Sequence, residues 1–462
     1  MTQSDSRLLS LIFLSFAVLV HFGYLTSAAL FCAVLSAAFA IVSLSPRCWG
    51  PPPRRFVWPG LVILLAATTV LYNRRLQGAV FIETFAATAA AILLFLLVKH
   101  VAARILAVAL AALATALGIA TNLTWGFFDI DVFHLQQNAA QALLSGQNPY
   151  TPVAMGPQQV AQGVYKEIPL HLPYGPTVPI LEAPLQWLGD IRILHILAAV
   201  AIAAAVLMLA RRAGTLDRAA GVVMAFPLTV GMVLVSWIDI ITMAGLAVWM
   251  VLFRSHPRIA TVALVLALGT KPTALIALVP IFFWSVRARR QVLIAALVTA
   301  LVLVPFAVAT GFAQFYYDVL GLHIAGFPRY DSLTVNSMLD LLGLPVIPAT
   351  VAAAIVCITT FLVLRRRPDT YGDLLAGTAI IVTVSFLLAK WAYFNYYYIA
   401  AVLLMLAIAG DNLALDSAEM IRPPALCSAA ARGLRGRLGR GAGTGRVPGL
   451  ALPGHEAHEP AA

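Results

Sequence analysis

The chain has 462 residues, of which 61% are hydrophobic and only 11% are charged. Soluble domains carry about a quarter charged residues, so this composition excludes an ordinary soluble protein. The net charge of +11 does not indicate nucleic-acid binding, because the arginines fall in short segments between apolar runs, where they orient membrane proteins. We therefore expect an integral membrane protein.

The apolar residues are grouped in blocks, and many uncharged runs approach the length of about 20 residues that a helix needs to cross a bilayer. In lipid every backbone polar group must be paired within the chain, so these runs must be helical. We expect an all-α, polytopic helical bundle of about 12–14 membrane segments, short half-helices included.

In chain order, the first hundred residues predict four spans, at 8–22, 25–44, 56–72 and 79–98. We interpret this part, 1–100, as an N-terminal group of additional transmembrane helices. Further spans are expected at 105–121, 191–210, 219–235, 239–253, 291–310, 346–364, 374–389 and 396–410.

Clusters of basic residues separate these runs, and the positive-inside rule places such clusters in the cytoplasm. They lie at Arg47–Arg55, Lys99–Arg104, Arg211–Arg218, Arg254–Arg258, Arg287–Arg290, Arg365–Arg367 and after Arg422. Both termini are then cytoplasmic, and 122–190 forms an outer loop. Arg74 and Arg75 are the exception to this pattern. The segment 411–462, rich in Gly, Ala, Arg and Pro, is expected to be a disordered basic cytoplasmic tail.

The segment 259–286 lies between two basic clusters, so the chain must cross and return within 28 residues. Gly269-Thr-Lys-Pro272 stands near its middle, and Gly and Pro both interrupt helices. We therefore predict two short half-helices, with Lys271 at their tip and facing the outer side. Irregular backbone at membrane depth is tolerated only where it lines a cavity or is buried in protein.

The outer loop begins with a pattern typical of an amphipathic helix lying at the membrane interface. Between Val132 and Leu144, apolar residues recur at helical spacing and amides fill the other faces,. Gly146 suits the position after the helix, and Pro149 prevents its continuation.

Two carboxylates precede this helix, Asp129 and Asp131. Asp131 can cap the helix. Either carboxylate can also accept a proton from a hydroxyl as general base, and the two together can hold a divalent cation such as Mg or Mn. No cofactor is otherwise indicated. His134, near the start of the helix, can assist either task.

These residues resemble the first outer loop of the GT-C glycosyltransferases, and most closely the polyprenyl-phosphomannose-dependent α-mannosyltransferases. In that family an Asp or Asp-x-Asp follows a span, then an amphipathic helix, then an ending like Ala140-Gln-Ala-Leu-Leu-Ser-Gly-Gln-Asn-Pro-Tyr150. The turn Leu172-Pro-Tyr-Gly-Pro176 is similar to the aromatic-x-Pro turn that comes next in the family. Shorter likenesses are Ser236-Trp-Ile-Asp239, Thr270-Lys-Pro272 and Asp331-Ser-Leu-Thr-Val-Asn336.

The resemblance covers roughly 101–410, which it implies is the catalytic transmembrane module. It implies a catalytic Asp in the first loop; the best frame is one residue off, and we favour Asp131 over Asp129. It further implies a polyprenyl-phosphate sugar donor, a glycolipid or glycan acceptor, inversion at the anomeric carbon and an extracytoplasmic active site in the inner or plasma membrane.

A departing lipid phosphate needs fixed positive charge. Lys271 is the first candidate for this contact, and Arg329 suits bidentate phosphate binding. The other expected substrate contacts are His134, Tyr174, Glu182, Asp239, His323, Asp331 and Lys390. The aromatic stretch after Lys390 can equally be an interfacial belt.

The alternative function is a polytopic transporter or flippase for a lipid-linked or small substrate. Transporters carry ionisable groups near the middle of their spans and often contain internal repeats. Here no repeat is visible, and Glu83 and His195 come closest to ionisable groups within spans. The sequence therefore favours an enzyme, without nucleic-acid partners.

Overall fold

The computed structural model describes residues 3–19, 26–44, 131–151, 171–216, 228–321, 331–366 and 368–415. Within these ranges the protein contains 15 α-helices, and its β-type pairing is a single bridge between Thr370 and Ala414. The helices are α1 Gln3–Leu19, α2 Ser27–Ser43, α6 Asp131–Leu144, α8 Thr177–Glu182, α9 Arg192–Ala213, α11 Leu228–Leu234, α12 Asp239–Leu252, α13 Pro257–Thr270, α14 Ala274–Trp284, α15 Val286–Thr310, α16 Phe312–Tyr316, α18 Val335–Leu341, α19 Ala349–Arg365, α20 Tyr371–Leu387 and α21 Phe394–Ala409. A 3₁₀-helix, η1 Ala183–Leu188, follows α8, and a π-helical turn, η2 Tyr317–Gly321, follows α16.

This confirms the predicted all-α class and most of the predicted helix positions within the described residues. Of the span expected at 219–235, the structure describes only the short helix α11. The cluster Arg287–Arg290, expected in a loop, lies in the first turns of α15, whose N-cap Ser285 accepts a hydrogen bond from the Ala288 N–H. The spans expected at 56–72, 79–98 and 105–121 and the tail after 415 lie outside the described residues.

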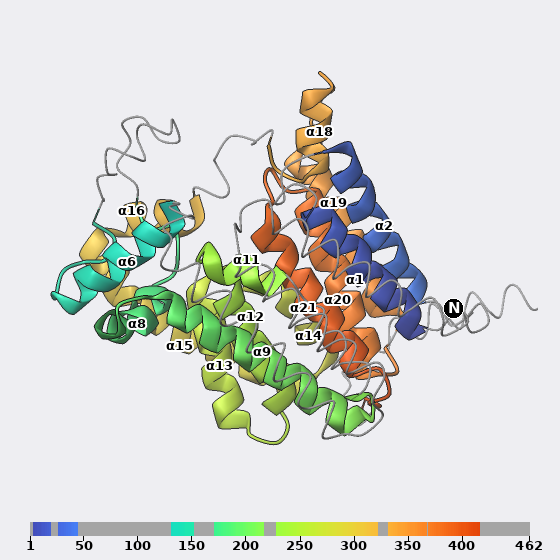
Figure 1. Ribbon diagram of the computed structural model, residues 1–462, viewed down its shortest axis with the longest axis horizontal. Helices are drawn as coiled ribbons and strands as arrows, with labels where there is room; N and C mark the ends of the chain where they lie inside the picture. Colours follow the sequence, from blue (N-terminus) through green and yellow to red (C-terminus); the bar gives the residue numbers. More distant parts are fainter. Residues whose placement is uncertain are drawn as a thin grey trace, which may run out of the picture. The chain divides into compact units, whose positions relative to one another are not determined.

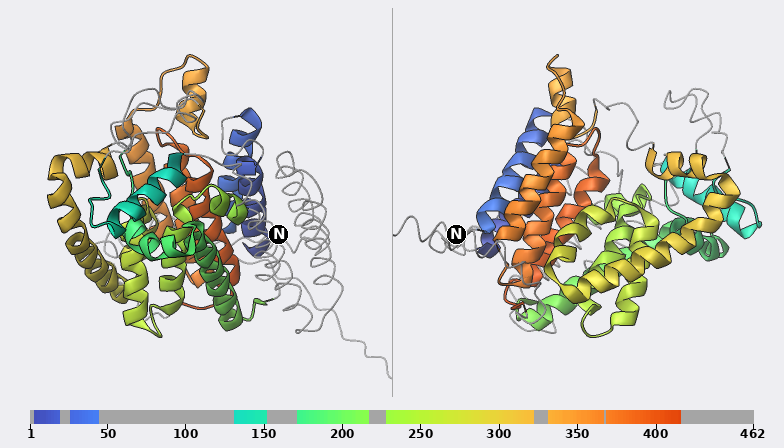
Figure 2. Two further views of the ribbon diagram at one scale, coloured as in Figure 1. Left: turned by 60° about the vertical axis from the view of Figure 1, so that its left-hand side comes forward. Right: turned by 180° about the vertical axis from the view of Figure 1, so that it is seen from behind.

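Two groups of helices make up the described bundle (Figures 1 and 2). In one group, α1 packs on α2 and α21, and α20 packs on α2, α19 and α21. In the other, α12 packs between α9 and α13, and α13 packs on α15. Contacts of α21 with α9 and α12, and of α14 with α20, join the two groups. Helix α12 therefore has its partners on several sides, and eleven of its residues are buried.

Several outer helices expose apolar side chains, the reverse of a soluble protein's surface. Helix α19 buries none of its 17 residues, and Ile358 and Phe361 on it are about 60% exposed. Along α15, Leu297 and Leu301 are exposed to a similar degree. Among the described helices, α9 and α15 are long and apolar enough to cross a membrane. Large exposed apolar surfaces indicate contact with another apolar phase, and here lipid is that phase.

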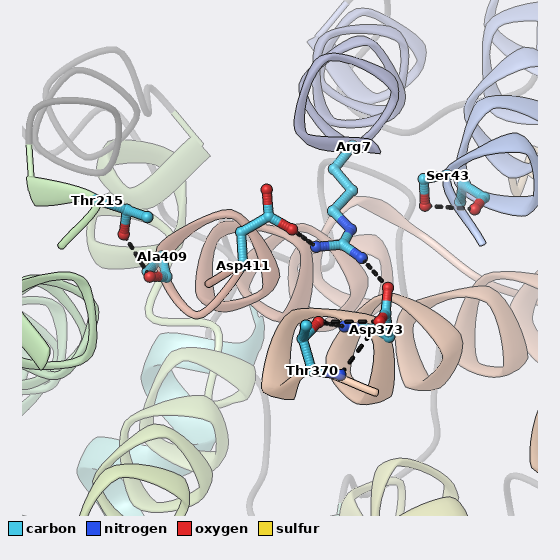
Figure 3. Close-up of polar contacts among 8 residues, drawn as sticks. Arg7, Ser43, Thr215, Thr370, Asp373, Ala409 and Asp411 are labelled. Carbon is cyan, nitrogen blue, oxygen red and sulfur yellow. Dashed lines mark hydrogen bonds and ion pairs between the residues drawn. The ribbon is translucent and has the colours of Figure 1, made fainter. Parts of the chain in front are cut away.

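Helix α1 is tied to the C-terminal helices by a buried arginine (Figure 3). The Arg7 side chain is fully buried, and its guanidinium pairs with Asp373 at the start of α20 and with Asp411 just after α21. Asp373 also forms a capping box with Thr370. A Cβ at Gly372 would overlap the Arg7 guanidinium. Charges buried this deeply need such partners, so the beginning of the chain is part of this helical bundle.

Candidate functional site

The interruption predicted between the two half-helices is present and centres on Lys271. Helix α13 ends at Thr270, Lys271 is extended with φ −151° and ψ 131°, and α14 begins at Ala274. Pro272 is the local cause, because it disfavours helical backbone at the preceding residue. The sequence thus correctly predicted the break; the side of the membrane that it faces stays a prediction.

The Pro-Tyr-Gly-Pro turn packs directly onto this break. The Gly175 N–H donates a hydrogen bond of 2.9 Å to the Thr270 carbonyl. A Cβ at Gly175 would overlap the Gly269 carbonyl, and a Cβ at Gly269 would overlap Thr177 Oγ1. Gly175 is therefore needed because its backbone touches that of Gly269, and Gly269 because it leaves room for the Thr177 side chain; close approach of this kind is one of the uses of glycine. Two segments about a hundred residues apart become neighbours.

Lys271 is held by a carboxylate on a different helix. Its Nζ lies 3.0 Å from both Oδ1 and Oδ2 of Asp239, in the first turn of α12. The Asn395 amide donates to Asp239 Oδ2 at 2.7 Å, and the Tyr396 ring centroid lies 4.1 Å from the Lys271 Nζ. We call these four residues the Asp239 cluster. All four side chains are buried, which strengthens each interaction because little water screens it.

The Asp239 cluster changes how the expected role of Lys271 has to be understood. Lys271 was expected to be an available cation for a phosphate, yet its charge is already balanced by Asp239. An approaching phosphate would have to share the ammonium with that carboxylate or displace it. Asp239, expected as a substrate contact, is the partner of Lys271 in this structure. Contact of either residue with a substrate stays a prediction.

Helix α6 is the amphipathic helix that the outer loop predicts, and Gly146 follows it with φ +69°. Its buried face carries Leu135, Ala139 and Gln136. The Gln136 Nε2 donates to the Ser236 carbonyl at 2.6 Å, which fixes α6 to the turn between α11 and α12. Of the two expected catalytic carboxylates, Asp131 is the first residue of α6, and Asp129 lies outside the described residues.

Tyr150 is the last residue of the stretch 140–150 that resembles the GT-C family, and it connects this loop to the Pro-Tyr-Gly-Pro turn. Its hydroxyl donates to the Tyr174 carbonyl at 2.7 Å, and its ring meets the Phe315 ring edge-on at 4.9 Å. Burial, with the nearby charge of Asp318, raises the pKa of the Tyr150 phenol well above its ordinary value. The phenol therefore stays protonated and serves as a hydrogen-bond donor.

Two of the remaining predicted residues, Asp331 and Lys390, lie around the segment before α21. Tyr393 donates to Asp331 Oδ1 at 2.7 Å, and the Leu333 N–H donates to the Ala392 carbonyl. Lys390 stands just before this segment, partly exposed. On α6, His134 is partly exposed and its ring lies edge-on to Phe133. The expected substrate contacts His323 and Arg329 lie outside the described residues.

The structure therefore brings together α6, Tyr150, the Pro-Tyr-Gly-Pro turn and the Asp239 cluster. Sequence reasoning missed Gln136 and Asn395, the two amides that join these pieces. Asn395 had one available signal, because it is the single amide in an aromatic stretch. The described residues contain no group of three or more His, Cys, Asp or Glu that could hold a metal. The side chains of the two suggested cation ligands, Asp129 and Asp131, are not among those described.

Comparison with known proteins gives one match. Residues 172–390 match Glycosyltransferase family 87. This range includes the Pro-Tyr-Gly-Pro turn, Asp239, Lys271, Asp331 and Lys390, while α6 lies before it. Neither a curated protein nor a solved structure matches the chain. The segment 172–390 is therefore similar to glycosyltransferase family 87, a GT-C-type family of membrane glycosyltransferases.

Proposed function

We propose that the protein transfers a sugar from a polyprenyl-phosphate donor to a glycolipid or glycan acceptor, and that mannose is the first sugar to test. The observation that carries the proposal is the convergence of α6 with the family 87 segment through the bond from Gln136 to Ser236. Because Asp131 opens α6, a first-loop carboxylate belongs to a helix that is anchored beside the Asp239 cluster. The family match favours this enzyme over the alternative, a transporter or flippase.

The reaction needs one proton acceptor and one stabiliser of negative charge. The acceptor hydroxyl oxygen attacks the anomeric carbon, and the bond from that carbon to the phosphate oxygen breaks with its electron pair on the phosphate. The hydroxyl proton passes to a carboxylate, Asp131 in our assignment and Asp129 as its alternative. Attack opposite the leaving phosphate inverts the anomeric centre.

The cations proposed for the leaving phosphate are Lys271, Arg329 and Lys390. A lipid phosphate monoester that gains charge as it leaves is stabilised by fixed donors in a site of low dielectric. Lys271 has a positioned ammonium, which Asp239 and Asn395 hold in place. A divalent cation bound by Asp129 and Asp131 would supply the same kind of stabilisation.

We place the active site on the extracytoplasmic face of the inner or plasma membrane and both termini in the cytoplasm. Support comes from the basic residues at helix ends, since Arg211 and Arg212 close α9 and Arg365 closes α19. The first turns of α15 add three more arginines. Under the positive-inside rule these ends are cytoplasmic, so the predicted outer loop lies on the opposite side.

The test uses membranes containing the full-length protein, a radiolabelled polyprenyl-phosphate mannose and a membrane glycolipid extract. Asp131→Asn should lower transfer at least about a hundredfold, the low end of what loss of a general base costs. Asp340→Asn, on α18, is the matched control and should transfer like the parent. Equal transfer by Asp131→Asn, Asp129→Asn and the parent would sink the catalytic assignment. Transfer from a nucleotide sugar but not from the lipid donor would reject the donor class.

A further inference from the structure

Ser236 has an unusual backbone conformation in the turn between α11 and α12. Its φ is +56°, and it is the one residue other than glycine with a positive φ in the described part of the chain. This left-handed conformation costs a non-glycine residue about 1–2 kcal/mol. Such strain gathers where a site requires a particular geometry, and Asp239 begins α12 only three residues later.

Four fully buried side chains in this region have polar atoms without a hydrogen-bond partner. The atoms are Gln136 Oε1, both carboxylate oxygens of Glu182, both ring nitrogens of His195 and Ser236 Oγ. All four residues have 0% exposure. A buried polar group without a partner costs about 1–3 kcal/mol, and native proteins retain few of them. The region therefore carries a cost that stability alone does not explain.

The contacts of three of these residues place them around the same turn. The Gln136 Nε2 donates to the Val132 and Ser236 carbonyls, so the amide orientation is fixed and Oε1 is left without a donor. The His195 ring interacts with the backbone of Ser236 and of Ile191, although neither contact has the geometry of a full hydrogen bond. One turn before His195 on α9, Arg192 lies over the Phe133 ring of α6 at 4.7 Å. His195 therefore belongs to the part of α9 that faces α6.

Glu182 approaches the same turn from α8. It stands four residues after Val178, so the two share one face of that helix. Val178 is buried in one core cluster with Leu135 of α6 and with Ile238, two residues beyond Ser236. The neighbouring 3₁₀-helix also contacts α6, since the Gln186 amide donates to the Gln137 carbonyl. Glu182 thus shares the face of α8 on which Val178 packs against α6 and the residue Ile238 beyond the Ser236 turn.

The chemistry of these groups selects a ligand rich in hydroxyls. Gln136 Oε1 accepts hydrogen bonds, the Ser236 hydroxyl can donate or accept, and a neutral imidazole offers one donor and one acceptor. Burial raises the pKa of the Glu182 carboxyl well above its usual value, and the protonated carboxyl can donate as well as accept. A sugar hydroxyl also donates and accepts, so adjacent hydroxyls on a ring can satisfy this mixed set. None of the four is a lysine or arginine, the permanent cations that bind phosphate.

We propose that Gln136, Glu182, His195 and Ser236 form a sugar-binding subsite that receives the hydroxyl groups of a substrate sugar. This inference rests on the proposed glycosyl transfer. The sugar can come from the donor or from the acceptor, since both carry ring hydroxyls, and the bound hydroxyls would satisfy the atoms that the folded chain leaves unpaired.

Binding measurements on the purified full-length protein in detergent test the subsite without requiring turnover. One arm compares polyprenyl-phosphate mannose with bare polyprenyl phosphate, and the other compares a membrane glycolipid extract before and after removal of its glycans. The parent should bind the sugar-bearing lipid more tightly in at least one arm. Ser236→Ala and Glu182→Gln should each shrink that preference by up to about tenfold, the value of one net hydrogen bond.

The matched control is Ser43→Ala, whose hydroxyl bonds only to the Ala40 carbonyl on α2; it should keep the parent's preference. Unchanged binding of bare polyprenyl phosphate by Ser236→Ala and Glu182→Gln shows that these variants are folded. If both keep the parent's preference in both arms, the subsite is refuted while the donor assignment stands. If the parent binds no polyprenyl phosphate at all, the donor assignment fails, and the glycolipid arm alone then supports or refutes the subsite.

Discussion

The Lys271 ammonium and the Asp239 carboxylate form a bidentate ion pair, with 3.0 Å from Nζ to each carboxylate oxygen. The two residues are 32 positions apart and belong to different helical segments, with Lys271 at 2% side-chain exposure and Asp239 at 0%. Asn395 adds α21 to the pair. One interaction thus connects α12, the break between α13 and α14, and α21, which are the elements that surround the proposed active site.

Breaking this pair on one side should destabilise the protein strongly. Lys271→Met leaves a buried carboxylate without its counter-charge, which typically costs about 3–5 kcal/mol. The double variant Asp239→Asn with Lys271→Met removes both charges and should recover most of that loss. Thermal unfolding in detergent measures the stabilities, with the exposed Arg258→Met as the control.

The sugar-transfer assay then distinguishes a structural role of Lys271 from a role in the reaction. If Lys271 stabilises the leaving phosphate, the double variant folds and yet transfers sugar poorly. A double variant with parental transfer would exclude that role for Lys271. A Lys271→Met protein as stable as the double variant would show that the pair does not hold the fold together.

The helix break was predictable from sequence, whereas its partner was not. Gly269 and Pro272 interrupt a helix by local backbone sterics, and the sequence shows them directly. Asp239 pairs with Lys271 only because α12 and α13 pack side by side. A sequence contains no local signal of that packing, so Asp239 could be named as a candidate residue but not as the partner of Lys271.

The contacts among the residues of the proposed sugar subsite could likewise not be predicted from the local sequence. The apolar spacing of 132–144 correctly predicts α6, but Gln136 is a polar residue on its buried face. Its hydrogen bond to Ser236 spans 100 positions. Serine usually avoids positive φ, so the residue type at position 236 does not predict this backbone conformation. Composition and spacing thus predicted the helices well, while the polar contacts between them depend on tertiary packing.

Gly175 and Gly269 should tolerate no side chain. In Gly175→Ala or Gly269→Ala the new Cβ would overlap an atom of the opposing segment, so the turn and the break must separate. We expect a loss of more than about 1 kcal/mol, the usual cost of replacing glycine in a left-handed conformation alone. The control is Gly146→Ala, where φ is +69° but nothing lies within 4 Å of the added Cβ. Equal losses at 146 and 175 would contradict the contact between the backbones.

Arg7 should contribute to the stability of the whole bundle even though it lies near the start of the chain. Arg7→Met leaves Asp373 and Asp411 partly buried and without their shared counter-charge, at a cost of about 3–5 kcal/mol. Neutralising both carboxylates in the Arg7→Met background should restore much of the stability. Thermal unfolding in detergent measures this, again against Arg258→Met. If Arg7→Met melts like Arg258→Met, the network in Figure 3 does not fasten α1 to the bundle.

The Asp318 carboxyl should make the stability of the folded protein depend on pH. It lies in η2, beyond the end of α15 and outside the helices long enough to cross a membrane. Burial raises the pKa of its carboxyl above the ordinary value of 3.8, against the opposing effects of the Gln314 hydrogen bond and the His171 charge. A raised pKa means that the folded protein holds this proton more tightly than the unfolded chain. The resulting stabilisation is complete below the ordinary value and is lost as pH rises through the raised value.

Asp318→Asn keeps the size of the side chain and its bond from Gln314 but cannot ionise. Its stability relative to the parent should therefore increase as pH rises from about 4, because only the parent must then bury a charge. Thermal unfolding in detergent across the pH range from about 4 to 7 measures the difference, with Asp340→Asn as the control. A relative stability that falls with pH would reverse the sign. It would mean that His171, whose Nδ1 lies 3.3 Å from Asp318 Oδ2, stabilises the ionised carboxylate by more than burial disfavours it.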